Sequence, residues 1–300
     1  ASIAESFGIA PVIVGLTIVS FGTSAPEVMV SVMATLDGSG DLAVGNALGS
    51  NIANIGLVLG VTLLITRIPV VTSLLRYEGS LLIAVTLLAG VFLYDAFIST
   101  IEGWVLLLLL VPLMWYLTRV KQREHSAKEL LEEFKQEVPH YSPKAAMLWF
   151  IVGLAALIAS SKVLVWGAVI TAESFGVSPL IIGLSIIAIG TSLPELAASV
   201  MSAIKGHHDI ALGNIVGSNI FNILAVMSMP GILGSSRMGA EVFSRDYFAM
   251  LGITLLLFIF LGAALLKRRQ DAKLGKLCGV LLLLLYTGYM VLIAQSQFSA

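Results

Sequence analysis

Apolar stretches of roughly 20 residues recur along the chain, separated by short polar turns. A helix of that length crosses a hydrocarbon layer of about 30 Å. The stretches are apolar on every side and show no polar stripe of helical period, which argues against a soluble helical protein with a deep core. We predict an all-α membrane protein whose spans are 10–34, 42–66, 78–98, 100–119, 146–171, 177–203, 210–233, 247–266 and 276–295.

One long polar segment interrupts this pattern after the fourth predicted span. It divides the chain into a first membrane half (1–119), a linker (120–145) and a second membrane half (146–300), and residues 127–137 of the linker form a candidate amphipathic helix. With the linker in the cytoplasm, 14 of the 17 Lys and Arg residues lie on the cytoplasmic side and two lie outside. The excess of positive charge inside predicts that the linker faces the cytoplasm. We expect a multi-pass protein of the cell's inner (plasma) membrane.

The two halves contain an internal repeat. Residues 6–56 align without a gap on residues 174–224, and roughly half of the aligned positions are identical. The copies begin five spans apart, so the second copy crosses the membrane in the opposite sense. Inverted repeats are typical of secondary transporters, whose binding sites lie where the copies meet. A full span precedes the second copy and only five residues precede the first, so we expect a parent architecture of five plus five helices whose first helix is absent from this chain.

Composition narrows the function further. The chain is 58% hydrophobic, has a net charge of −1 and contains one cysteine, Cys278. A lone cysteine excludes an internal disulfide or a cysteine-based zinc site, and no basic patch with interleaved aromatic residues suggests a nucleic-acid partner. We expect no cofactor and no obligate protein partner.

Each copy carries the motif GTSxPE deep inside a predicted span, with Glu27 in the first copy and Glu195 in the second. An ionised carboxylate inside a membrane costs at least a few kcal/mol and therefore indicates function. Pro26 and Pro194 each remove a backbone donor, which frees carbonyl groups four residues earlier. In a membrane, such carbonyls can instead face a cation in a cavity.

A second polar helix follows in each copy, with the sequences GNALGSNIANIG and GNIVGSNIFNIL. Its serine and asparagine are four residues apart and share one helix face: Ser50 with Asn54, and Ser218 with Asn222. These side chains either line a site or merely hydrogen-bond the helices together. Four further asparagines are candidates for bracing residues around the site: Asn46, Asn51, Asn214 and Asn219.

Every candidate ligand in these motifs is an oxygen atom, which is the donor that hard cations prefer. The set contains neither His nor Cys, which argues against zinc and copper. Two carboxylates match the charge of one Ca²⁺, and Mg²⁺ is disfavoured because it requires stricter octahedral geometry. The additional hydroxyl and amide oxygens suit Na⁺, whereas proton exchange would not require them.

At these residues the sequence resembles the calcium/cation antiporter superfamily, specifically the prokaryotic sodium/calcium exchangers. The resemblance implies ten helices, alternating access and Ca²⁺ movement driven by Na⁺. It implies that Ca²⁺ is held by two carboxylates and two backbone carbonyls: Glu27, Glu195, Thr23 and Thr191. It implies Na⁺ sites lined by four serines and two further carbonyls: Ser24, Ser50, Ser192, Ser218, Ser20 and Ala188. Asn54 and Asn222 match the family's central polar pair.

Several alternatives remain open at this point. Some members of the superfamily, potassium-dependent ones among them, carry Asp at one central position, and the two asparagines here argue against K⁺ co-transport. Ca²⁺/H⁺ antiport is the other alternative among transporters. A Ca²⁺ channel is disfavoured by the inverted repeat, and an intramembrane hydrolase lacks a convincing base or metal triad, so we expect a transporter and not an enzyme. Lys162, also within a span, is expected to extend towards the outer headgroups.

Overall fold

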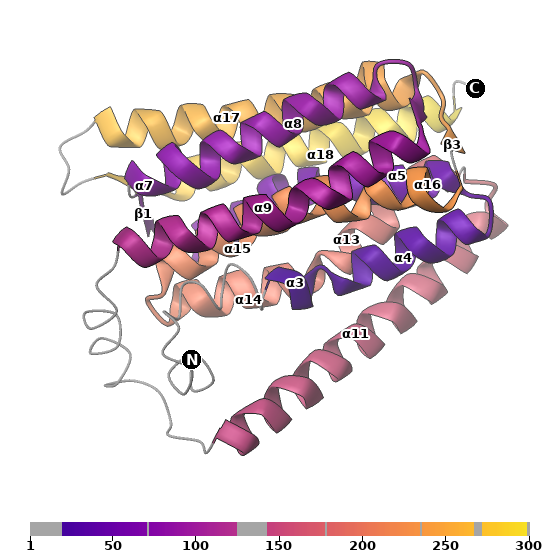
Figure 1. Ribbon diagram of the computed structural model, residues 1–300. Coiled ribbons are helices and arrows are strands. Elements are labelled where there is room, and N and C mark those ends of the chain that lie inside the picture. The colour runs from indigo at the N-terminus through magenta and orange to yellow at the C-terminus, as the bar shows by residue number, and fades with distance from the viewer. Residues whose placement is uncertain are drawn as a thin grey trace.

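The computed structural model describes residues 20–70, 72–124, 143–177, 179–234, 236–266 and 272–298. They form a bundle of long helices with short β-ladders near its two ends (Figure 1). The linker residues 125–142, with the candidate amphipathic helix, and the side chain of Lys162 lie outside this description.

The first half consists of the following elements: α3 (Ser20–Thr23), α4 (Ala25–Leu36), α5 (Gly40–Ala53), the π-helical turn η2 (Asn54–Leu59), α6 (Gly60–Ile65), β1 (Ile68–Pro69), α7 (Thr72–Leu74), η3 (Leu75–Gly79), α8 (Ser80–Leu93), β2 (Phe97–Ile98) and α9 (Thr100–Glu124). The second half consists of these: α11 (Pro143–Ser174), α12 (Pro179–Ile182), η4 (Gly183–Ile187), α13 (Ala188–Thr191), α14 (Leu193–Ile204), α15 (His208–Phe221), η5 (Asn222–Val226), α16 (Ser228–Leu233), β3 (Ser236–Arg237), η6 (Val242–Tyr247), α17 (Phe248–Leu266), β4 (Lys273–Leu274) and α18 (Lys276–Phe298).

Among the described residues, seven helical stretches are long and apolar enough to cross a membrane: Gly40–Ile65, Thr72–Leu93, Thr100–Leu117, Leu180–Ile204, Ile210–Leu233, Val242–Leu266 and Lys276–Ser296. They confirm the second to fourth and the sixth to ninth predicted spans. The predicted span 146–171 lies within α11, one helix of 32 residues. The predicted span 10–34 begins outside the described residues, and its described part consists of α3 and α4.

The predicted edges of two spans were wrong. The spans predicted at 78–98 and 247–266 begin at Thr72 and Val242, and the first ends at Leu93. The first turns of both spans contain charged residues. Glu78 and Asp246 are nevertheless only 1% and 0% exposed, so the charged first turns belong to the spans.

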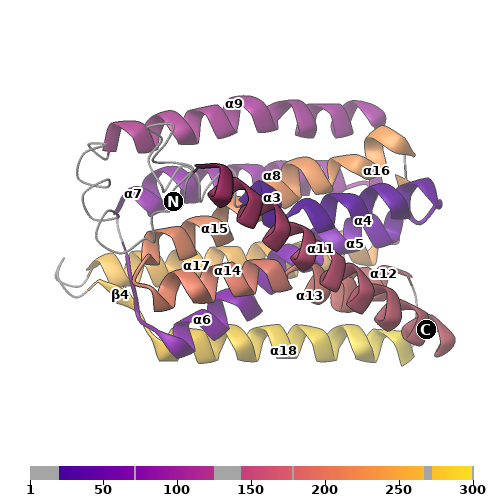
Figure 2. The same cartoon turned by 90° about the horizontal axis from the view of Figure 1, so that it is seen from below.

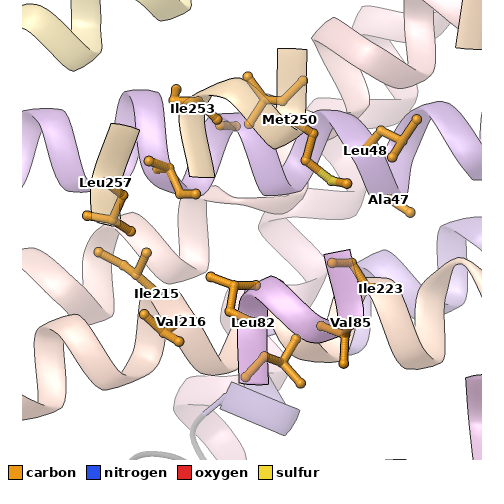
Figure 3. Packing of buried hydrophobic residues seen from close by; sticks show 14 of the residues in the cluster. Ala47, Leu48, Leu82, Val85, Ile215, Val216, Ile223, Met250, Ile253 and Leu257 are labelled. Atoms are coloured by element: carbon orange, nitrogen blue, oxygen red, sulfur yellow. The ribbon is translucent and has the colours of Figure 1, made fainter. Parts of the chain in front are cut away.

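The second helices of the two copies lie at the centre of the bundle. In the spans Gly40–Ile65 and Ile210–Leu233, 78% and 94% of the 18 most apolar consecutive residues are buried, compared with 17% in Thr100–Leu117. Figure 3 shows side chains from α5 and α15 meeting others from α8 and α17. The central helices are buried on all sides because other helices surround them, and the outer helices present large apolar side chains outward.

The two copies are arranged in opposite directions. β1 and β3 occupy equivalent positions in the repeat, yet they lie at opposite ends of the bundle (Figure 1). Each ladder joins one half to the other, because β1 pairs with β4 and β2 pairs with β3, both antiparallel. Seen from below, β4 lies at the same end as α7, and α6 lies beside α18 (Figure 2). This placement agrees with the inverted repeat that the sequence predicts.

Candidate ion-binding site

Both copies break their first helix at the same motif residue. In the first copy, α3 ends at Thr23, Ser24 is not helical and α4 begins at Ala25, with Pro26 in its first turn. In the second copy, α13 ends at Thr191, Ser192 is not helical and α14 begins at Leu193, with Pro194 in its first turn. The proline N atom cannot donate a hydrogen bond, which favours the interruption at this point. The prediction of broken helices is confirmed.

The breaks bring the two glutamates together. Glu27 and Glu195 each lie in the first turn after the break, and both are 0% exposed. Ser24, three residues before Glu27, donates a hydrogen bond to Glu195, so the two breaks lie side by side. α4 packs against α5, and α14 packs against α15, so the serine and asparagine helix of each copy flanks its own glutamate.

The carboxylate of Glu195 is held by serines from both copies. Ser24 Oγ donates to Glu195 Oε1 at 3.0 Å, and Ser218 Oγ donates to the same oxygen at 3.4 Å. The other oxygen, Oε2, is buried without a hydrogen-bond partner among the described residues. Glu195 therefore has one braced oxygen and one that is available to a ligand.

The carboxylate of Glu27 is held differently. Both of its oxygens are buried without a hydrogen-bond partner among the described residues. Its backbone is anchored instead, because Asn46 Nδ2 donates to the Glu27 carbonyl at 3.0 Å. An ionised and unpartnered carboxylate is costly to bury, so the arrangement favours a bound cation or proton there.

A second set of contacts links the copies through Thr191. Its hydroxyl donates to the Ile187 carbonyl at 3.0 Å and lies 3.3 Å from Ser50 Oγ and 3.4 Å from Asn46 Oδ1. The Ala188 carbonyl accepts the backbone N–H of Ser192 at 3.1 Å and lies 3.5 Å from the Thr191 hydroxyl. Ser20 opens α3, and its side chain lies outside the described part of the chain.

The central asparagines are all buried, but their polar atoms differ in how many hydrogen bonds they make. Asn54 Nδ2 donates to Asn219 Oδ1 at 3.0 Å, and Asn219 Nδ2 donates to the Asn51 carbonyl at 3.3 Å. Asn54 Oδ1 and both polar atoms of Asn222 have no hydrogen-bond partner among the described residues. The bracing predicted for Asn219 and Asn46 is visible as these hydrogen bonds, and Asn214 likewise donates to Ser199 Oγ at 3.2 Å.

Among the described residues, the site offers oxygen ligands for hard cations and no cluster of side chains that would hold a transition metal. The described residues contain no group of three or more His, Cys, Asp and Glu side chains suited to a metal. The buried oxygens without a hydrogen-bond partner at the motifs come instead from carboxylate, hydroxyl and amide groups: Glu27 Oε1 and Oε2, Glu195 Oε2, Ser192 Oγ, Asn54 Oδ1 and Asn222 Oδ1. Such a mixed set of oxygens suits Ca²⁺ and Na⁺.

Sequence reasoning missed a second pair of buried acidic residues. Glu78 and Asp246 are 168 positions apart, the offset of the repeat, and both start long helices. Asp246 accepts hydrogen bonds from Arg245 at 2.7 Å and from the Tyr289 hydroxyl at 3.0 Å. Extending the repeat alignment beyond residue 224 would have revealed the pair. Asp246 is satisfied by protein groups, which indicates a packing role that ties η6 to α18.

Comparisons with known proteins agree with this description. The sequence profile of the family described as "Sodium/calcium exchanger protein" matches residues 1–119 and 145–295. The chain is 46% identical to the putative antiporter CaxA of Alkalimonas amylolytica, over 98% of this chain and 92% of that protein. It is 26% identical to the sodium/calcium exchanger MaX1 of Methanosarcina acetivorans, over 97% and 91% of the two chains.

The inner membrane protein YrbG of Escherichia coli (strain K12) is 39% identical, over 93% of this chain and 85% of that protein. Among solved structures, the sodium-calcium exchanger NCX_Mj, soaked with Na⁺ and Ca²⁺, superimposes with a TM-score of 0.75 at 28% identity. That superposition covers 97% of this chain and 89% of the other.

Proposed function

Because the chain belongs to the sodium/calcium exchanger family, we propose that it exchanges Na⁺ for Ca²⁺ across the membrane by alternating access. The observation that carries this proposal is the buried pair Glu27 and Glu195, contributed by opposite copies of the repeat. Their combined charge of −2 matches one Ca²⁺, which accepts the irregular shell of oxygens around them. We further propose that the linker 120–145 faces the cytoplasm.

Competition at one site would couple the two ions. Glu27, Glu195 and the carbonyls of Thr23 and Thr191 are the proposed Ca²⁺ ligands. The proposed Na⁺ ligands are the serines and carbonyls that surround them: Ser24, Ser50, Ser192, Ser218, Ser20 and Ala188. Several Na⁺ ions would satisfy the same carboxylates that one Ca²⁺ satisfies, so the two cannot be bound fully at once. Asn54 and Asn222 complete the centre as neutral amides, which favours Na⁺ over protons or K⁺ as the exchanged ion.

The test is ⁴⁵Ca²⁺ uptake into liposomes that contain the purified protein, with Na⁺, H⁺ and K⁺ gradients imposed separately. We expect an outward Na⁺ gradient to drive uptake and the H⁺ and K⁺ gradients to have little effect. Liposomes containing the Glu195→Gln variant serve as the inactive control. Uptake driven by a proton gradient alone would replace this proposal with Ca²⁺/H⁺ antiport.

A further inference from the structure

Asn46 lies where the two copies of the repeat make a close contact. It is fully buried on α5. A Cβ atom on Gly183 of η4 would lie 3.1 Å from the Asn46 backbone N and 2.6 Å from the Leu42 carbonyl. Only glycine allows the second copy to approach the first this closely. Asn46 can therefore reach groups on both copies.

The Asn46 side chain contacts both copies of the repeat. Its amide nitrogen donates to the Glu27 carbonyl at 3.0 Å and to Ser31 Oγ at 3.2 Å. Its amide oxygen lies 3.4 Å from the Thr191 hydroxyl, whose single proton also points to the nearer Ile187 carbonyl at 3.0 Å. Both donor hydrogens therefore have partners, and the acceptor oxygen competes with the Ile187 carbonyl for the Thr191 proton. One side chain thus joins the segment bearing Glu27 to a residue of the broken helix in the other copy.

We expect the Asn46 contacts to affect the position of Glu27 more than the equivalent Asn214 contacts affect the position of Glu195. The Glu27 carboxylate accepts no hydrogen bond from the described residues, so its position depends on its backbone. The Glu195 carboxylate has Ser24 and Ser218 to hold it directly. Removing a backbone anchor should therefore displace Glu27 and leave Glu195 in place.

We infer that Asn46 is a positioning residue, which sets the affinity for Ca²⁺ by holding Glu27 against Thr191 without touching the ion. This inference rests on the proposed function, because it assumes that Glu27 binds Ca²⁺. Side chains that orient ligands in this way typically change metal affinity roughly 10- to 100-fold when they are removed.

The experiment compares two asparagines that occupy equivalent positions in the repeat. Equilibrium binding of ⁴⁵Ca²⁺ to purified protein in detergent is measured for the wild type, Asn46→Ala and Asn214→Ala. We expect Asn46→Ala to raise the Kd for Ca²⁺ roughly 10- to 100-fold and Asn214→Ala to raise it much less. In Na⁺-driven uptake, we expect the KM of Asn46→Ala to rise while its maximal rate at saturating Ca²⁺ stays near that of the wild type.

A milder pair of variants covers the case in which Asn46→Ala does not fold. Ser31→Ala removes one partner of Asn46, and Ser199→Ala removes the equivalent partner of Asn214. We expect Ser31→Ala to weaken Ca²⁺ binding by roughly twofold or more and Ser199→Ala to leave it unchanged. Size-exclusion elution and thermal stability confirm folding of each variant.

The outcomes separate the two hypotheses. Equal Ca²⁺ affinities for folded Asn46→Ala and Asn214→Ala, or a loss of maximal rate with an unchanged KM, would overturn the positioning role and leave the proposed function intact. If Asn46→Ala does not fold, equal affinities for Ser31→Ala and Ser199→Ala would overturn it. Wild-type protein that binds no Ca²⁺ would overturn both.

Discussion

Glu195 in the second repeat accepts hydrogen bonds from Ser24 and Ser218, whereas Glu27 in the first repeat accepts none from the described residues. Two serines at equivalent positions of the repeat could hold Glu27 in the same way. Ser192 is the counterpart of Ser24, but its hydroxyl is buried without a partner among the described residues, and Ser50, the counterpart of Ser218, lies beside Thr191 instead. Two nearly identical motifs therefore form two different environments.

The difference has a physical reason in transporters built from inverted repeats. When access alternates, each copy adopts the conformation that the other copy had before. Under the proposed alternating access, a state open to one side only is asymmetric even where the sequence is symmetric. In the opposite state we expect Ser192 and Ser50 to hold Glu27 and Ser24 to release Glu195.

The largest expected effect comes from neutralising either glutamate. Glu27→Gln and Glu195→Gln each remove half of the site's negative charge, and we expect each to abolish Ca²⁺ transport and to weaken Ca²⁺ binding at least ~100-fold. Calorimetry on the purified variants measures the binding, and thermal unfolding checks that they are folded. Unchanged Ca²⁺ binding in either variant would contradict the shared site.

The contact between the two copies of the repeat depends on Gly49, which has no side chain and so permits tight packing. A Cβ atom there would lie 2.7 Å from both Ala188 Cβ and the Leu184 carbonyl, so we expect Gly49→Ala to destabilise the protein by about 1–3 kcal/mol. A Cβ atom on Gly252 of α17 would meet no described atom within 4 Å beyond its chain neighbours and the backbone of its own helix. Gly252→Ala is therefore the control and should be neutral or slightly stabilising. Thermal unfolding in detergent decides between these outcomes, and equal stability of the two variants would refute the tight contact.

The central asparagines offer a test of ion selectivity. Asn54→Asp adds a third negative charge beside the glutamates, so we expect a change of at least a few-fold in the dependence of Ca²⁺ uptake on Na⁺ or K⁺. Asn222→Asp is the matched variant, and it does not disturb the hydrogen bond between Asn54 and Asn219. Uptake measured against Na⁺ and K⁺ concentration provides the readout. Profiles identical to the wild type in both variants would remove Asn54 and Asn222 from the site.

The smallest expected effect concerns the two motif serines. Ser24→Ala loses its hydrogen bond to Glu195 and should lower the free energy of unfolding by about 1 kcal/mol. Ser192→Ala loses no side-chain hydrogen bond to the described residues and should leave the stability nearly unchanged. Thermal unfolding in ion-free detergent solution measures both. Equal destabilisation by the two substitutions would contradict the difference in hydrogen bonding between Glu195 and Glu27.

The sequence was sufficient to predict most of the fold, and the ligand roles given to the site residues stay predictions. Runs of apolar residues predicted the spans, and the prolines of GTSxPE predicted helix breaks that the structure places at Ser24 and Ser192. Glu78 and Asp246 lie in the first turns of the two spans whose predicted edges were wrong, and their burial could not be read from the sequence alone. The unequal bracing of Glu27 and Glu195 was not predictable, since the two motifs are nearly identical in sequence.

The central claim is that Na⁺ and Ca²⁺ compete for one site built around Glu27 and Glu195. Its most direct test is equilibrium ⁴⁵Ca²⁺ binding to the purified wild-type protein over a range of Na⁺ concentrations, with choline keeping the ionic strength constant. Since at least two Na⁺ are needed to match the charge of one Ca²⁺, we predict that the apparent Kd for Ca²⁺ rises at least as the square of the Na⁺ concentration. A Kd that does not change with Na⁺ would contradict the account.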